Sequence, residues 1–322
     1  MAANVAHIRF AQQTPGAPVT TAGNTYDSRH PFPPPLTSGT AWHYTSAEAL
    51  HGIWGGDDMW ASAVRVLNDA NEITYGIKAI QDSWGTRRER ETNTQAVKFI
   101  DSAINAVGES TQALTARTFI ISASLDRDLL NQWMHSGGKD GYALGLTMEM
   151  HWDSKARLSP PTATHGAMSP IHSGWYKVEY SAEKQSELIT NAINWIIANF
   201  ESVSSSPEGS AFSRYILSTV AVLLKHAAFD AEQEVRFVCS LSESESKMIK
   251  YRVSDSQFIP YVPISSTKPA RATGTPPALE VHEIRCGPNV PKPNVQVLRD
   301  MTNLGGGYPK ISQSTIPLAG RA

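Results

Sequence analysis

This chain has little cysteine, no long apolar run and no excess of charge of one sign. Its two cysteines, Cys239 and Cys286, are too few for a disulfide framework or a cysteine-rich zinc site, and they favour a reducing compartment. No uninterrupted apolar run reaches the ~18 residues that span a bilayer, and Met1–Phe10 lacks the apolar core of a secretion signal. We therefore expect a cytoplasmic protein without a membrane partner.

The charge balance limits the kinds of partner. The chain has 28 Lys and Arg residues and 30 Asp and Glu residues, which leave a net charge of −2. This balance excludes a nucleic-acid-binding protein that is basic over its whole surface. It does not exclude a local basic patch. Arg87–Arg90 is one basic cluster, and both a solvated helix face and a nucleic-acid contact remain open for it.

Several motifs that mark known chemistry are also missing. No glycine-rich nucleotide loop lies between an expected strand and helix, because Gly305–Gly307 is followed by Tyr308 and Pro309 and reads as a turn. Neither a His-Glu-x-x-His zinc motif nor a Gly-x-Ser-x-Gly nucleophile elbow occurs. We therefore expect no bound metal.

The composition nevertheless supports a folded domain. The 322 residues are 41% hydrophobic and include 8 Trp, enough for a sizeable core. Residues 11–41 are rich in Pro, Thr, Gly and Ala, so we predict that residues 1–41 form a Pro-rich arm, poorly ordered or draped, whose first 35 residues are dispensable for folding. Residues 42–322 are predicted to form a single domain with a helical insertion around 181–228.

Apolar periodicity predicts an α+β fold. Helical stripes dominate the first two thirds of the chain and strand patterns dominate the last third, which does not fit a doubly wound parallel sheet. Thr45 and Asp69 are expected to cap helices. The remaining helices are expected within 97–107, 126–135, 186–200 and 211–228, and the strands within 42–44, 118–122, 141–148, 175–180, 235–239, 249–253, 258–262, 279–286 and 311–316.

Three segments carry candidate functional side chains. His43–Ser46 lies where a strand meets a helix, Met59–Ala61 precedes Leu67–Glu72, and Glu232–Val238 enters a strand. Glu232 and Glu234 share one face of that strand, so their like charges repel and one pKa is expected to rise. Each segment also has a structural interpretation: a structural histidine, a helix cap, or carboxylates paired with Arg236.

The order of these segments resembles a large, mostly uncharacterised bacterial family, a domain of unknown function. That family shares a His-Tyr-Thr-Ser start, a Leu-Trp-Ala strand, a Leu-Asn-Asp-x-x-Glu helix and a Glu-x-Glu-x-Arg strand. The corresponding segments here are His43–Ser46, Met59–Ala61, Leu67–Glu72 and Glu232–Arg236. The resemblance spans about 42–318.

A more distant resemblance, to the ADP-ribosyltransferase superfamily, implies strongly curved mixed or antiparallel sheets and an NAD site. It implies that His43 binds a ribose, that Trp60 stacks on nicotinamide, and that Glu234 or Glu232 stabilises the ribosyl cation. The chain departs from the usual pattern at Tyr44 and at Trp60. The further cofactor-binding residues implied by this resemblance are Tyr44, Thr45, Ala61, Arg65, Asn68 and Arg236, of which Arg65 and Arg236 are offered to the pyrophosphate.

The implied activity is mono-ADP-ribosyl transfer from NAD, used as a substrate, to a protein or nucleic acid. Cleavage of the nicotinamide–ribose bond passes through an oxocarbenium-like state that a fixed carboxylate stabilises. By analogy the chain is a toxin or an antiphage defence effector, with an antitoxin or regulatory partner. Two alternatives are kept: an NAD glycohydrolase on the same fold, and a non-catalytic nucleotide-sensing or partner-binding module.

Overall fold

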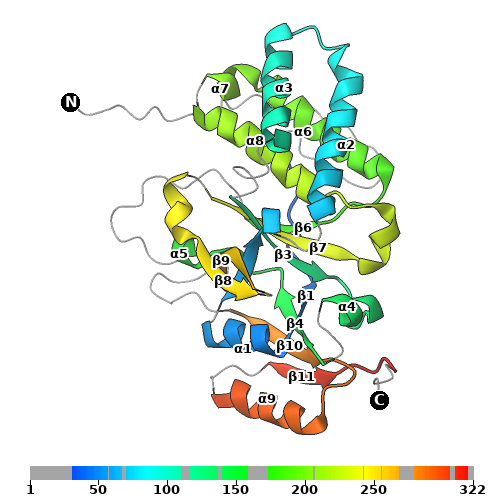
Figure 1. Ribbon diagram of the computed structural model, residues 1–322, viewed down its shortest axis with the longest axis vertical. Coiled ribbons are helices and arrows are strands. Elements are labelled where there is room, and N and C mark those ends of the chain that lie inside the picture. Colours follow the sequence, from blue (N-terminus) through cyan, green and yellow to red (C-terminus); the bar gives the residue numbers. More distant parts are fainter. Residues whose placement is uncertain are drawn as a thin grey trace, which may run out of the picture.

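The structure is a computed structural model, and it describes eleven segments of the chain (Figure 1). The described residues are 31–56, 58–66, 70–109, 117–136, 140–158, 173–205, 207–241, 243–254, 256–267, 279–304 and 309–317. Among the helices in these segments, none combines the length and the apolar character needed to cross a bilayer.

An 11-stranded mixed sheet runs through the molecule in the order β11-β10-β4-β1-β3-β2-β9-β5, with β7 branching from β3, β6 from β7 and β8 from β9. The pairs are antiparallel except for β10 with β11, which is parallel. The strands are β1 (Thr40–Thr45), β2 (Met59–Ala63), β3 (Thr118–Ser124), β4 (Tyr142–Thr147), β5 (His151–Ser154), β6 (Gly174–Lys177), β7 (Glu234–Ser240), β8 (Lys250–Ser254), β9 (Gln257–Thr267), β10 (Val281–Cys286) and β11 (Lys310–Gln313).

The α+β class is confirmed, whereas the expected strong curvature is wrong. The strands form an open, branched sheet that is not strongly curled, with helices stacked beyond it at both ends of the long axis (Figure 1). The branching gives β3 partners on both of its edges, so it lies at the centre of the sheet. Because β3 pairs with β1, β2 and β7, side chains from distant parts of the chain lie close together around it.

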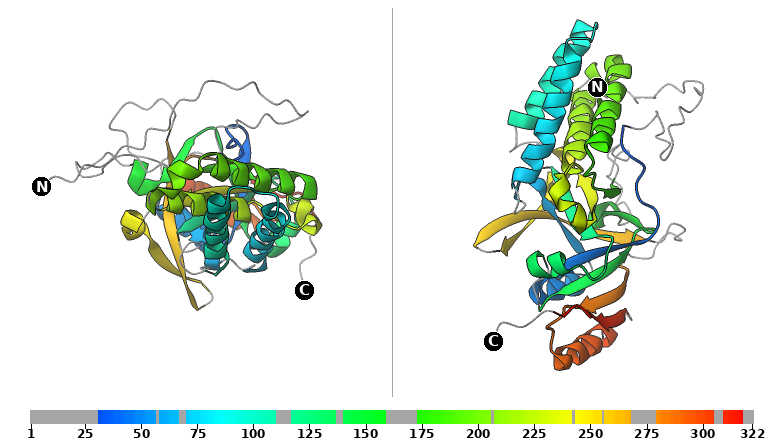
Figure 2. Two further views of the ribbon diagram at one scale, coloured as in Figure 1. Left: turned by 90° about the horizontal axis from the view of Figure 1, so that it is seen from above. Right: turned by 90° about the vertical axis from the view of Figure 1, so that its right-hand side faces the viewer.

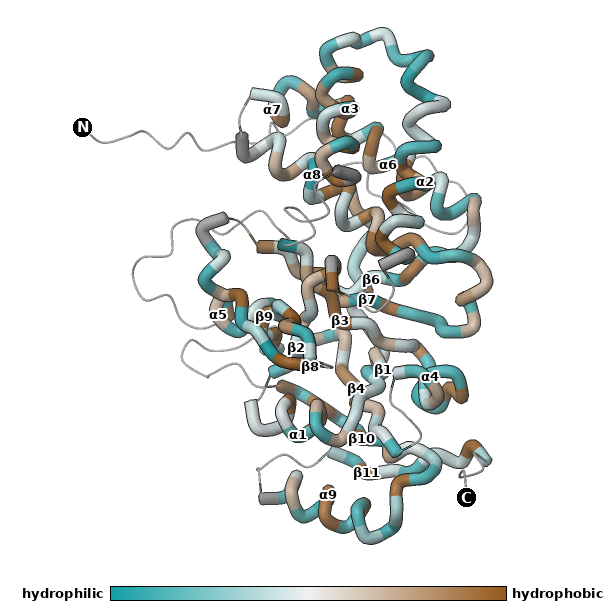
Figure 3. Tube along the Cα trace, viewed as in Figure 1, coloured by the Kyte–Doolittle hydropathy of each residue, from teal (hydrophilic) through white to brown (hydrophobic). Residues whose placement is uncertain are grey.

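A helical layer covers one face of the β3–β7 region (Figures 1 and 2). It contains α2 (Ala70–Arg88), α3 (Thr94–Glu109), α6 (Ala182–Ala198), α7 (Phe200–Ser204) and α8 (Pro207–Val222). Their apolar side chains form one core cluster with Ile120 of β3 and Val238 of β7. The outer ends of α2 and α3, far from that core, are largely hydrophilic (Figure 3). Within the described part of 181–228 lie the helices α6, α7 and α8, which pack on helices from an earlier part of the chain, and their status as an insertion stays a prediction.

The opposite face of β3 and β7 packs on a second core cluster, which includes Phe119 and Phe237. The helices α1 (Ala47–Gly56) and α9 (Lys292–Leu304) contribute Leu50 and Leu298 to it. The helices α4 (Leu130–His135) and α5 (Lys155–Leu158) and the 3-10 segments η1 (Val64–Val66), η2 (Ala227–Glu232) and η3 (Glu243–Met248) complete the described elements. Alternation along β3 and β7 therefore divides their side chains between two cores.

Two local expectations need correction. Thr45 does not cap the first helix, because it is the last residue of β1 and is buried. Ser46 takes that place: its hydroxyl accepts a hydrogen bond from the backbone nitrogen of Ala49 at 3.2 Å. The helix expected over 126–135 begins only at Leu130. The other expected cap, Asp69, lies outside the described residues.

Part of the expected N-terminal arm is built into the fold. Phe32 is 7% exposed and belongs to the helical core cluster, where its ring contacts Tyr215 edge to face at 5.3 Å. The backbone nitrogen of Leu36 donates to the carbonyl of Trp175 at 2.7 Å, and β1 begins at Thr40. This packing contradicts the expectation that residues 1–35 are dispensable, because their removal takes Phe32 out of the core.

We predict that Phe32→Ala lowers the free energy of unfolding by about 3 kcal/mol, the usual cost of deleting a buried phenyl ring. Chemical denaturation of the full chain measures this change. Leu130→Ala, at a half-exposed position on α4, is the matched control and should have little effect. Equal stability of Phe32→Ala and the unmodified protein would show that the segment merely lies against the surface.

Candidate functional site

The candidate site begins where one edge of β3 changes partner. Along its other edge β3 pairs continuously with β7, but on this edge Ser124 pairs with Trp42 of β1 and Ile120 pairs with Ser62 of β2. Ser122 lies between the two partner strands. It is exposed, although its neighbours on β3 are buried. The sheet therefore splits at a polar, accessible residue in the middle of an otherwise apolar strand.

His43 lies at this split. Its Nδ1 is 2.9 Å from the carbonyl oxygen of Ser122. A carbonyl only accepts hydrogen bonds, so Nδ1 carries the proton, and in the neutral ring Nε2 is left as an acceptor. Burial lowers the pKa of His43, and the charge of Arg252 lowers it further, against an opposing effect of the Ser122 bond. His43 is thus a neutral imidazole at pH 7 with an acceptor nitrogen.

Glu234 lies on the other side of Ser122. It is the first residue of β7 and pairs with Ser124, and the nearby Ser122 side chain contributes to lowering the pKa of its carboxyl. Its backbone nitrogen donates to the Tyr180 hydroxyl at 3.0 Å. Ser122 therefore contacts His43 through its carbonyl and lies near enough to Glu234 to affect its pKa, so two of the predicted catalytic residues share it as a neighbour.

Five charged side chains surround this point, and we call them the charge cluster: Glu72, Lys225, Glu232, Glu234 and Arg236. Arg236 donates to both oxygens of Glu234, at 2.7 and 2.9 Å, and also contacts Glu72. Lys225 Nζ lies 2.7 Å from Glu72, 2.7 Å from Glu232 and 3.1 Å from Glu234. Three carboxylates therefore face two cations.

The cluster fixes the charge of Glu234. Burial alone would raise the pKa of this carboxyl, but the charge and hydrogen bonds of Arg236, together with Lys225 and Ser122, bring it below its ordinary value. The rise expected from repulsion between Glu232 and Glu234 is therefore wrong for Glu234. The two carboxylates come from different elements, the end of η2 and the start of β7, joined by Gln233 at φ 47°, and they share Lys225.

Arg236 is committed to this cluster. Its side chain is 4% exposed, and its third contact is the Val222 carbonyl oxygen, 2.6 Å from Nη1. With Glu234, Glu72 and a carbonyl as partners, Arg236 has its hydrogen-bond donors engaged inside the protein. The expected pyrophosphate role of Arg236 is therefore corrected to that of an ion-pair partner, the alternative that the sequence left open.

Trp60 lies on the neighbouring strand β2 and is half-buried. Its Nε1 donates to Asp58 Oδ1 at 3.1 Å, and its ring centroid lies 5.5 Å from that of Tyr261. Arg252 Cζ lies 5.7 Å from the Trp60 ring centroid, and Arg252 also donates to the Ser62 hydroxyl at 3.1 Å. Because the same guanidinium charge lowers the pKa of His43, Arg252 lies within electrostatic range of both predicted residues.

Other predicted site residues have packing roles. The Tyr44 hydroxyl donates to the Asp126 carbonyl and accepts from the Leu129 nitrogen, both at 2.9 Å, and its ring packs edge-on against Trp133 at 4.7 Å. Thr45 and Ala61 are buried. All three side chains are buried in the described structure, and their role in nucleotide binding stays a prediction. Asn68 and the side chain of Arg65 lie outside the described residues.

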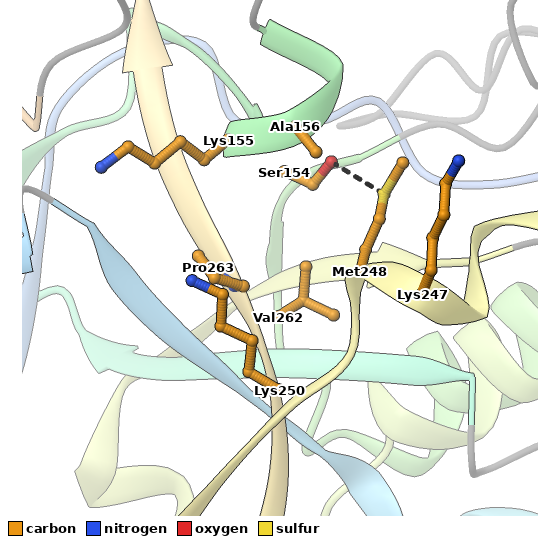
Figure 4. A pocket seen from close by; sticks show the side chains of 8 residues that line it. All are labelled: Ser154, Lys155, Ala156, Lys247, Met248, Lys250, Val262 and Pro263. Atoms are coloured by element: carbon orange, nitrogen blue, oxygen red, sulfur yellow. Dashed lines mark hydrogen bonds between the residues drawn. The ribbon is translucent and has the colours of Figure 1, made fainter. Parts of the chain in front are cut away.

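A cavity of about 450 Å³ lies elsewhere, between α5, η3 and β9. Its lining residues are Ser154, Lys155, Ala156, Lys247, Met248, Lys250, Val262 and Pro263 (Figure 4). The predicted triad of His43, Trp60 and Glu234 does not line it. Asp58 connects the predicted triad to the cavity, because its carboxylate accepts a hydrogen bond from Trp60 and forms an ion pair with Lys155 at 3.4 Å.

Sequence reasoning missed four of the residues that build the site: Ser62, Ser122, Lys225 and Arg252. Ser122 left a signal, since a polar residue in an apolar strand is a departure from the pattern. Glu72 ended the candidate segment Leu67–Glu72 but was not assigned a role in the site. Lys225 follows α8 and left no signal in the local sequence.

Comparison with known proteins adds a partial family match. Residues 132–237 match the model of a protein family of unknown function, DUF2971. The match includes Lys225, Glu232, Glu234 and Arg236 of the charge cluster, and excludes His43 and Trp60. No curated protein and no solved structure matches the chain. The matched family is described without an activity, and nothing in these comparisons links it to ADP-ribosyltransferases.

Proposed function

We propose that the protein cleaves NAD and transfers ADP-ribose to a macromolecule, a protein or a nucleic acid, on an ADP-ribosyltransferase-like arrangement of strands. The single observation that supports this proposal is that His43 and Glu234 both lie beside Ser122 at the split edge of β3, where His43 Nδ1 contacts the Ser122 carbonyl and the Ser122 side chain lies near enough to Glu234 to lower its pKa. Residues 79 positions apart along the chain, His43 and Ser122, meet there beside an ionised carboxylate. The chemistry of NAD cleavage needs these residue types in one place.

Glu234 is suited to the cation that forms during cleavage. The nicotinamide–ribose bond breaks as positive charge develops on the ribose, so a carboxylate that is already ionised and fixed lowers the barrier without reorganisation. Arg236 and Lys225 hold Glu234 in place and keep it charged. With three carboxylates facing two cations, the cluster carries one uncompensated negative charge that a ribosyl cation would neutralise.

His43 and Glu232 complete the proposed chemistry. The Nε2 of neutral His43 accepts a hydrogen bond from a ribose hydroxyl, since Nδ1–H is already donated to Ser122. The side chain of Glu232 is 21% exposed, against 6% for Glu234, so it is the more accessible of the two to an incoming acceptor. We assign Glu232 to orienting the acceptor, and Trp60 to stacking on nicotinamide.

One observation favours a second function, a non-catalytic nucleotide-sensing or partner-binding module. Every charged side chain of the cluster has at least one partner of opposite charge within the cluster, as in a purely structural ion-pair network. In that case Glu234 holds the helical layer on the sheet and does not meet a substrate. The role of toxin or antiphage effector, with an antitoxin or regulatory partner, belongs to the first proposal alone.

The test is the fate of NAD labelled on its adenylate part, incubated with the purified protein and a cell extract as the source of acceptor. Free nicotinamide with a labelled macromolecule supports transfer. Free nicotinamide with free ADP-ribose alone identifies a glycohydrolase. Intact NAD in both the presence and the absence of extract contradicts catalysis and leaves the binding module.

We predict that His43→Ala weakens NAD binding by roughly tenfold, the value of one hydrogen bond to a ribose hydroxyl. Titration calorimetry measures the dissociation constant, and His135→Ala, at an exposed position on α4, is the matched control. An unchanged dissociation constant for a folded His43→Ala protein would remove His43 from the site.

A further inference from the structure

The cavity between α5, η3 and β9 is lined by three cations around an apolar floor. Lys155, Lys247 and Lys250 contribute the charges, and Met248, Val262 and Pro263 contribute much of the floor. In Figure 4 the side chains of Lys155 and Lys250 extend to one side of the cavity and that of Lys247 to the other. Its volume of about 450 Å³ falls within the ~300–1,000 Å³ of small-molecule sites.

Two of these lysines have no structural task in the described part of the chain. The ammonium group of neither Lys247 nor Lys250 forms a hydrogen bond or an ion pair there, and both side chains are exposed. Lys250 lies near enough to Asp58 for its charge to act on that carboxyl, but does not bind it. Like charges that gather without partners repel one another, so an anion between them is stabilised.

Lys155 differs, because its Nζ already donates to the Gly56 carbonyl at 2.7 Å and pairs with Asp58. These bonds fix the ammonium at the cavity wall and leave Lys247 and Lys250 as the adaptable cations. The Ser154 side chain is also fixed, because its hydroxyl contacts the Met248 sulfur at 3.7 Å. Bonds therefore fix Lys155 and Ser154 at the cavity wall, whereas the side chains of Lys247 and Lys250 make no such bonds in the described part of the chain.

We propose that this cavity binds a phosphorylated small molecule with a flat apolar part, of the class of nucleoside phosphates. The phosphates contact Lys155 and Lys250, Lys247 contacts a further anionic group, and the apolar part lies on Met248, Val262 and Pro263. Lysine ammonium groups bind phosphate as strongly hydrated point charges. This site differs from the proposed NAD site and does not depend on the activity proposed there.

Titration calorimetry with ATP as the probe tests the assignment on the full chain. We expect Lys250→Gln and Lys247→Gln each to weaken ATP binding by about tenfold, as loss of a charge-assisted hydrogen bond does. Lys98→Gln, at an exposed position on α3, is the matched control and should bind as the unmodified protein does. Tripolyphosphate should bind more weakly than ATP, because it leaves the apolar floor uncovered.

Three results would overturn the assignment. These are the absence of ATP binding, ATP binding that is unchanged in the double variant of Lys247 and Lys250, and ATP binding that the double variant keeps but Trp60→Ala loses. The last result would place the nucleotide at the predicted NAD site instead. Both lysine side chains are exposed and have no partner among the described residues, so the variants should remain folded, which circular dichroism verifies. Failure of NAD cleavage leaves these binding results unaffected, so the two proposals are tested separately.

Discussion

Replacing Glu234 with glutamine should lower the rate of nicotinamide release by roughly 100- to 1000-fold, the usual value of one preorganised charge at a developing ion. The variant should still fold. Removing one carboxylate charge leaves Glu72 and Glu232 facing Lys225 and Arg236, so two charges of each sign remain. The loss therefore falls on turnover, while NAD affinity stays close to that of the unmodified protein.

Two further variants are compared with Glu234→Gln. Glu201→Gln changes an exposed carboxylate on α7 and should leave turnover unchanged. Glu232→Gln should affect cleavage less than Glu234→Gln, and should instead reduce transfer to the acceptor relative to hydrolysis. A Glu234→Gln protein that is less stable but retains its specific activity would show that the carboxylate is structural.

Arg236→Met should cost about 3–5 kcal/mol of unfolding free energy, the usual penalty for removing one partner of a buried ion pair. The variant leaves Glu72, Glu232 and Glu234 facing Lys225 alone, and it also leaves the Val222 carbonyl without its donor. Denaturation in urea at pH 7 measures the change. Arg88→Met breaks the exposed pair with Asp101 and is the matched control, for which little change is expected.

The same variant has a characteristic pH dependence. In the unmodified protein the pKa of Glu234 is below its unfolded value, so its contribution to stability is present above that unfolded value and is lost as the pH falls through the folded pKa. Without Arg236 this contribution is gone, so the difference in stability between the two proteins should be largest at neutral pH and should shrink in acid. A deficit that is independent of pH would point to lost packing instead of lost charge pairing.

The local elements could be predicted from the sequence because their signals are local. The apolar stripe from Val97 to Val107 identified α3, and the β-rich run from Val235 identified β7. The pairing of Glu234 with Arg236 was also within reach, because side chains two positions apart on a strand share a face. In each case the pattern spans only a few consecutive residues, so it does not depend on contacts with distant parts of the chain.

The rest depends on contacts between distant segments. The split of β3 between β1 and β2 is a matter of register, which apolar alternation alone does not set. Lys225 enters the cluster because α8 packs on the sheet, and Phe32 is buried because helices from elsewhere in the chain cover it. The short β5 and α5, which build the lysine-lined cavity, carry too few residues for a periodic signal.

The central claim, that His43 and Glu234 form an NAD site at the split edge of β3, is tested most directly by a crystal structure with a non-hydrolysable NAD analogue. We predict that a hydroxyl of the nicotinamide ribose lies within hydrogen-bond distance of Glu234, that His43 Nε2 accepts from a ribose hydroxyl, and that the nicotinamide ring stacks on Trp60. An analogue bound away from β3, or a saturated crystal with the split edge empty and the charge cluster unchanged, would contradict this claim.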